Sequence, residues 1–255
     1  MTFGIDNFET FLLILVRITG FLFTAPFFSL RNVPVRVKSG IALFMTIILF
    51  YSVSYPMPEY IGVLGYTILV VKEALVGAIM GFFSNIAYQI IAFAGEIIDT
   101  EIGFSMVNEI DPTTNIQTTI TANFYGYLIT LMMLITNLHN YFIQAIVDSF
   151  QVIGLGKMNL NPATYKLMGK FLTDYFMIGF RIVLPVYAAI LVVNTILAII
   201  AKIAPQMNMF VVGMQLKIFV GLIVLMLIIQ LVPAVADNIF TEMFDLLKDS
   251  IKLLH

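Results

Sequence analysis

The side chains of this sequence that could do chemistry are charged residues inside or at the edge of long apolar runs. A charge at the centre of a membrane helix costs at least about 2.5 to 3.5 kcal/mol, so it needs a partner. We therefore expect interhelix or intersubunit polar contacts at these positions. Snorkelling from a run end to the polar surface is the alternative, and it fits Lys202 and Arg17 best. The charges that predict polar contacts are Arg17, Lys72, Glu73, Glu96, Asp99, Arg181 and Lys217.

Lys72 and Glu73 are adjacent within one apolar run. Neighbouring residues point about 100° apart around a helix, so these two side chains should not face each other, and each should pair elsewhere. Glu73 could also carry a proton or an ion, because transporters place carboxylates at mid-membrane sites. A small secondary transporter therefore stays open as an alternative function.

Glu96 and Asp99 are three residues apart and share one helix face, as a general acid and base pair would need. Such a pair requires a substrate cleft and further catalytic groups. The sequence has no cysteine, only two histidines (His139 and His255) and no G-x4-GK-[ST] phosphate loop. We therefore expect no enzyme, no metal site and no cofactor.

The composition is that of a membrane protein. Of 255 residues, 60% are hydrophobic and 11% are charged, and the mean hydropathy is +1.00. The net charge of -2 gives no reason to expect a nucleic-acid partner. Residues 1–10 carry no basic side chain, so the first apolar stretch is expected to remain in place rather than be cleaved. Because no linker divides the chain, residues 1–255 are predicted to form one domain.

Six apolar runs predict an all-α fold, because a backbone inside lipid must satisfy its own hydrogen bonds. Pro185 and Pro233 lie within runs and predict kinks. The run at 61–98 is too long for one ordinary bilayer crossing, and we expect a break near Lys72 and Glu73. The runs cover residues 8–28, 41–55, 61–98, 122–147, 171–201 and 211–236.

Basic residues cluster in two loops, which the positive-inside rule places in the cytoplasm. A plain six-helix count places three crossings between them and would put these loops on opposite sides. Division of the run at 61–98 into two segments gives an odd total of crossings, with the N-terminus outside and the C-terminus inside, and removes the conflict. The clusters are Arg31, Arg36 and Lys38, and Lys157, Lys166 and Lys170.

The segment at 95–121 is unusually polar for its apolar surroundings. It holds five of the fifteen carboxylates, and seven of the nine residues from 113 to 121 are Thr, Asn or Gln. It could be a solvated external loop. It could also be an irregular segment inside a channel, where apolar side chains such as Phe104 obstruct the lumen and Gly103 lets them move.

Several motifs resemble the FliR family of flagellar and virulence type III secretion export gates. They are R-x13-R-x2-P-x3-K from Arg17 to Lys38, AGEIID at 94–99, GFSM at 103–106 with the D-P at 111–112, and APQMNMFVVG at 204–213. The likeness runs in order along the chain. The basic residue before APQ is Lys202, where many members carry Arg, so a bidentate contact there is doubtful.

This resemblance implies a polytopic protein of long kinked hairpins that assembles with homologous-type subunits into a helical pore for unfolded flagellar substrates. The expected partners are FliP, FliQ and FlhB, in the bacterial inner membrane at the flagellar basal body. The assembled gate would stand largely above the bilayer. A virulence gate subunit is the other branch of the same family.

The resemblance also assigns parts of the chain. Residues from about 1 to 200 would form FliP-like helices, with a plug loop near 103–120, and residues from about 171 to 255 a FliQ-like hairpin and tail. The plug residues would be Gly103, Phe104, Ser105, Met106, Val107, Asn108, Ile110, Asp111 and Pro112. The turn at the cytoplasmic entrance would hold Lys202, Pro205, Gln206, Asn208 and Phe210.

The tail from 239 to 254 predicts an amphipathic helix. Its apolar positions, Phe240, Met243, Leu247, Ile251 and Leu254, recur at helical spacing. This face could lie on the membrane or on a partner such as FlhB, or it could pack on its own chain.

Overall fold

The fold is all-α in the computed structural model, which describes residues 5–29, 33–52, 56, 58–106, 119–159, 162 and 164–255. Within these ranges there is no strand. The helices are α1 (Ile5–Thr24), α2 (Val35–Ser52), α3 (Gly62–Ile102), α4 (Ile120–Ile135), α5 (His139–Val152), α6 (Thr164–Ile203), α7 (Met209–Ile228) and α8 (Val232–Leu253), with short 3-10 turns at Phe104–Met106 and Ile229–Leu231.

Five helical stretches are long and apolar enough to cross a membrane. They are Asn7–Thr24, Val35–Ser52, Gly62–Ile102, Met168–Ile203 and Met209–Leu253, the last of which joins α7 to α8. Long apolar helices without strands are what a bilayer requires of a spanning chain. The predicted fold class, an all-α polytopic membrane protein, is confirmed.

The expected break near Lys72 and Glu73 is wrong. Helix α3 runs through both residues without interruption for 41 residues, a length of about 62 Å. Both charges meet polar partners on another element, as the site below shows, so the helix does not have to open to satisfy them. A crossing of ordinary length therefore uses only part of α3.

The apolar run at 122–147 was expected to be one helix, and that expectation is also wrong. Helix α4 ends at Ile135 and α5 begins at His139. Asn137 between them has a φ of 56°. Asparagine is among the few residues with a side chain that readily adopt this left-handed conformation, so a tight turn forms within an apolar run.

The chain forms two compact units, each built from separate stretches of sequence. Unit 1 contains residues 1–88, 134–171 and 240–255, and unit 2 contains residues 89–133 and 172–239. The boundaries between the stretches fall inside α3, α4, α6 and α8. Each unit is described by itself below.

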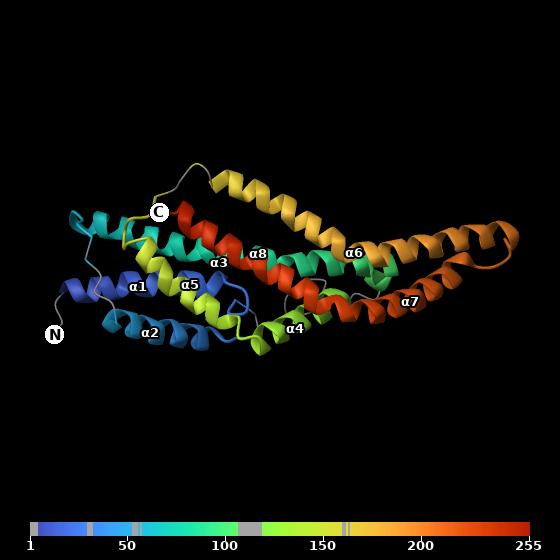
Figure 1. The fold of residues 1–255 in the computed structure, drawn as a ribbon, viewed down its shortest axis with the longest axis horizontal. Coiled ribbons are helices and arrows are strands. Elements are labelled where there is room, and N and C mark those ends of the chain that lie inside the picture. The colour runs from blue at the N-terminus through green and yellow to red at the C-terminus, as the bar shows by residue number, and fades with distance from the viewer. Residues whose placement is uncertain are drawn as a thin grey trace. The chain divides into compact units, whose positions relative to one another are not determined.

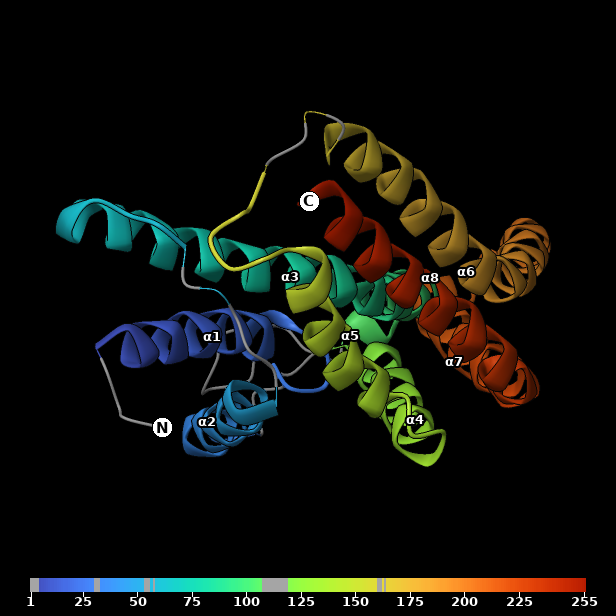
Figure 2. The same ribbon diagram turned by 60° about the vertical axis from the view of Figure 1, so that its left-hand side comes forward.

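In unit 1, α1 lies beside α2 and along the first part of α3 (Figures 1 and 2). The approach of α1 to α3 depends on two glycines of α3. A Cβ atom at Gly77 would collide with the carbonyl oxygen of Arg17, and one at Gly81 would collide with the hydroxyl of Thr24. Glycine at both positions therefore lets the two backbones come into direct contact.

The end of α8 completes the core of unit 1. All five apolar positions predicted for the tail, from Phe240 in α8 to Leu254 just after it, are buried, and the backbone N–H of Asn159 donates to the carbonyl of Leu254 at 3.1 Å. The ring of Phe244 lies 5.4 Å from those of Tyr141 and Phe142 on α5. Of the two interpretations of the tail, packing on its own chain is the one that the structure shows.

Unit 2 contains the second half of α3, most of α4 and the hairpin of α6 and α7 (Figure 1). Phe93 of α3 packs against three rings of α6, those of Tyr175, Phe176 and Phe180, with centroids 5.3 to 5.8 Å apart. Pro185 lies inside α6, whose ribbon bends near its middle, and the other proline in a run, Pro233, follows the 3-10 turn that precedes α8.

Candidate functional site

A buried ion pair joins α1 to α3 in unit 1. Arg17 and Glu73 are both fully buried. The Nε atom of Arg17 donates to Glu73 Oε2 at 2.5 Å, and its Nη2 donates to Glu73 Oε1 at 3.1 Å. Two parallel bonds of this kind are the strongest arrangement between a guanidinium and a carboxylate. Arg17 is therefore a buried partner of α3, and the snorkelling alternative for this residue is wrong.

The same guanidinium also caps the C-terminal end of α5. Its Nη1 atom donates to the carbonyl oxygens of Ser149 at 3.2 Å and Ile153 at 2.9 Å. The guanidinium carbon also lies 4.2 Å from the ring centroid of Phe150. The last carbonyls of a helix have no partner within the helix and carry partial negative charge, so a cation there stabilises the helix end. Arg17 thus binds both α3 and α5.

Lys72 and Glu73 both bind Gly156, in the loop after α5. The backbone N–H of Gly156 donates to Glu73 Oε1 at 2.7 Å, and Lys72 Nζ donates to the Gly156 carbonyl at 3.4 Å. Gly156 has a φ of 71°, a conformation that glycine adopts without strain. The two neighbouring charges thus do not pair with each other but bind the same loop residue, and the Arg17–Glu73 cluster ties α1, α3 and the end of α5 together.

A second buried carboxylate, Asp99, lies in unit 2 near the end of α3. It accepts hydrogen bonds from the backbone N–H of Thr121, at 3.1 and 3.2 Å, and from the hydroxyl of the same residue. Thr121 is in the first turn of α4, where N–H groups lack helical partners and a negative charge is favourable. Close packing at the same place brings Gly95 against Ala122. The Asp99–Thr121 contact thus joins the two helices that flank the polar segment.

Glu96 and Asp99 have different surroundings. Asp99 is buried and bonded, whereas Glu96 is exposed. The structure does not bring them together as an acid and base pair. Across the described ranges, no group of three or more His, Cys, Asp or Glu side chains is placed to hold a metal ion.

The predicted plug is described only at its start. Gly103 has a φ of 98°, and Phe104, Ser105 and Met106 form a 3-10 turn. Phe104 lines a hollow of about 330 Å³ in unit 2, together with α4 and α7 residues such as Tyr125 and Met226. The other predicted plug residues, Val107, Asn108, Ile110, Asp111 and Pro112, lie outside the described residues.

Two further predicted contact residues, Lys217 and Arg181, are also in unit 2. Lys217 of α7 lines a partly polar hollow of about 320 Å³, together with Glu101 and Gly103. Arg181 is exposed, and its Nη2 lies 3.5 Å from the sulfur of Met177 on the same helix. The structure therefore shows no interhelix partner for Arg181 within the part of the chain that it describes.

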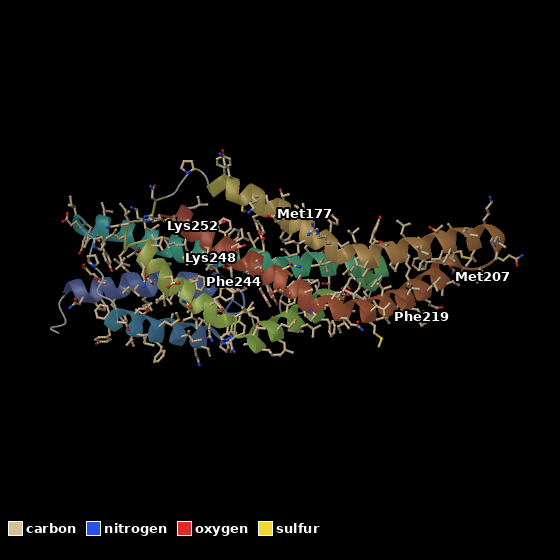
Figure 3. The ribbon with its side chains drawn as sticks, in the orientation of Figure 1. Met177, Met207, Phe219, Phe244, Lys248 and Lys252 are labelled. Atoms are coloured by element: carbon tan, nitrogen blue, oxygen red, sulfur yellow. The ribbon has the colours of Figure 1, made fainter. Side chains whose placement is uncertain are left out.

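The predicted entrance residues surround the turn between α6 and α7, where Figure 3 shows Met207. Asn208 precedes α7, and its side-chain oxygen accepts from the backbone N–H of Phe210 at 3.2 Å. Lys202, Pro205 and Gln206 belong to the same stretch, and Lys202 is exposed. Their sequence explains the sharp end of the hairpin, since a proline and a capping asparagine stop one helix and start the next.

Sequence reasoning could not find the backbone partners of Arg17 and Glu73. Every residue has a carbonyl, so nothing in the sequence marks those of Ser149 and Ile153 as ligands of Arg17. The partial signal is GLG at 154–156, which marks a turn after an apolar helix. That signal predicts a tight loop but not its partner.

Comparison with known proteins finds related chains over nearly the full length. The family model described as "Bacterial export proteins, family 1" matches residues 8–243. A Bacillus subtilis protein named "Flagellar biosynthetic protein FliR" is 34% identical over 98% of this chain and 97% of its own length. An Escherichia coli protein of the same name is 30% identical over 94% and 92%, and one from Aquifex aeolicus is 27% identical over 92% and 91%.

The matched region contains the Arg17–Glu73 cluster, the Asp99–Thr121 contact and the α6–α7 hairpin. The resemblance that the motifs suggested is therefore confirmed: the chain belongs to the FliR family, family 1 of the bacterial export proteins.

Proposed function

We propose that this protein is a core subunit of the flagellar type III export gate, forming part of the channel through which unfolded flagellar proteins leave the cytoplasm. The observation that carries the proposal is membership of the export family over residues 8–243, with relatives that have the flagellar name and nearly the same extent. The five apolar stretches are consistent with entry into the bacterial inner membrane. The flagellar rather than the virulence branch is favoured by the names of these relatives.

Exposed apolar surface supports assembly with other subunits. On α7, the buried residues are Gly213 and Gly221, while Phe210, Phe219 and Met226 are at least 63% exposed. Figure 3 shows Phe219 partway along this helix. A surface of this kind must face lipid or protein. We infer that FliP and FliQ subunits cover it, with FlhB as a further partner, and that the assembled gate stands largely above the bilayer.

We also propose that the segment near 103–120 plugs the closed channel. Two features support this. Gly103 turns the chain directly after α3, and the Asp99–Thr121 contact holds the far flank of the segment close to the end of α3. A segment whose two ends are fixed close together can extend only a short distance from them. It could therefore obstruct a narrow pore and remain inside that pore.

The mechanism needs no bond-making chemistry in this chain. Apolar walls that pack in the closed state and separate in the open state would let an unfolded substrate pass. By the family resemblance, residues from about 1 to 200 would build FliP-like helices and residues from about 171 to 255 the FliQ-like hairpin and tail, with the Lys202–Phe210 turn near the entrance. Arg181 and Lys217 would then bind neighbouring subunits.

Purification of the full chain from cells in mild detergent, with mass measurement of what accompanies it, tests the proposal. A complex that contains several further membrane subunits is expected, together with restored motility when the gene replaces that of a flagellar relative. A chain that runs alone would contradict the export-gate function. Ion-coupled uptake by the purified chain in liposomes would instead establish the secondary transporter.

A further inference from the structure

A groove runs between α5 and the end of α8 in unit 1, with a volume of about 530 Å³. Ala145 and Val152 of α5 and Leu247 and Ile251 of α8 give it an apolar lining. The aromatic rings of Tyr141 and Phe244, which also line it, are in contact with each other, with centroids 5.4 Å apart. Leu247 and Ile251 are buried, so this lining is fixed by the core of the unit.

Charged side chains stand at the rim of this groove. Lys248 and Lys252 lie one turn apart on α8, as Figure 3 shows, and Asp148 stands on α5. Lys252 Nζ is 3.2 Å from Asp249, but both side chains are well exposed, so this pair contributes little. Lys248 makes no ion pair with any residue for which the structure gives a position. The α8 rim therefore offers two cations to a ligand.

We propose that this groove binds an anionic phospholipid, with an acyl chain along the apolar lining and the phosphate between Lys248 and Lys252. Basic sites between membrane helices recognise anionic headgroups, and lysines hold their ammonium groups at the polar interface above apolar surface. A helix of a partner protein is a poorer fit, because a helix is about 10 Å across and the groove has room for only about one turn of it. An acyl chain is thinner and fits the same volume along its length.

Native mass spectrometry of the full-length chain in mild detergent tests this proposal. Phosphatidylglycerol and phosphatidylcholine with the same acyl chains are titrated in parallel. We expect phosphatidylglycerol to be retained roughly tenfold more tightly, and Lys248→Gln/Lys252→Gln to remove that preference, since each interfacial lysine contributes to anionic lipid binding. Lys166→Gln/Lys170→Gln is the matched control: its lysines are also four apart on an exposed helix face, and the preference should persist.

A second variant separates the acyl site from simple attraction of charge. Ala145→Phe would fill the groove and keep both lysines, so retention of phosphatidylglycerol should fall at least roughly tenfold. Circular dichroism confirms that each variant remains helical. Equal retention of the two lipids by the native chain, or unchanged retention by Ala145→Phe, would overturn the proposal. So would a photo-crosslinker at Tyr141 that captures a second protein rather than lipid in cells.

Discussion

The guanidinium of Arg17 and the carboxylate of Glu73 share two hydrogen bonds in a place where neither side chain is exposed. Removal of one partner should therefore be far worse than removal of both. Arg17→Ala leaves a buried carboxylate without its cation, which costs about 3 to 5 kcal/mol in comparable pairs. We expect a large fall in the melting temperature of the purified chain in detergent.

Two further variants test the reason for that loss. Arg17→Lys keeps the charge but cannot make both bonds to Glu73 and reach the α5 carbonyls, so its melting temperature should lie between those of the native chain and Arg17→Ala. The double variant Arg17→Met/Glu73→Met removes both charges and should be more stable than Arg17→Ala. If Arg17→Ala has the same melting temperature as the native protein, the ion pair does not hold α1 to α3.

The contact between α1 and α3 gives a second prediction. Ala at Gly77 would place a Cβ atom against the Arg17 carbonyl, while Ala at Gly40 would meet nothing within 4 Å. Both are helical positions, where Gly to Ala alone gains about 1 kcal/mol. Gly77→Ala should nevertheless lower the melting temperature, whereas Gly40→Ala should leave it equal or higher. Equal behaviour of the two variants would show that the helices can separate without cost.

The third prediction concerns the Asp99–Thr121 contact. Asp99→Ala removes the acceptor at the start of α4, a change that costs about 0.5 to 2 kcal/mol at helix N-termini. If the polar segment is the plug, a loosened flank should also raise the ion leak through the assembled gate in planar bilayers. Glu96→Ala, on the exposed side of the same helix, is the control and should leave the leak unchanged. A tight gate with Asp99→Ala would show that the contact only caps α4.

The proposed plug is tested by its removal. If the segment near 103–120 obstructs the channel, deletion of residues 106–115 should raise ion conductance through the assembled gate, because the obstruction would be shortened or lost. Replacement of the same ten residues by Gly and Ser of equal length distinguishes a missing obstruction from a shortened connection. Conductance that stays at the native value in both would remove the plug from the mechanism and leave the segment as a passive connection.

The sequence predicted the fold class well, because lipid leaves an apolar chain almost no alternative to helices. It did not predict where a helix ends within an apolar run or continues past charged residues. Asn137 ends an apolar run that reads as a single helix, and α3 continues past two charges that read as a break. The sequence showed that Lys72 and Glu73 do not pair with each other, but not that both bind the backbone of one residue, Gly156.

The double contact at Gly156 also fixes how α3 is turned about its own axis. Glu73 takes the N–H and Lys72 the carbonyl of one peptide residue, so the loop distinguishes neighbouring positions on the helix by the sign of their charge. A slip of α3 by one residue would rotate it by about 100° and bring the ammonium of Lys72 toward the guanidinium of Arg17. Two buried cations would then face each other. The loop at Gly156 therefore favours one rotation of α3 about its axis over the neighbouring ones.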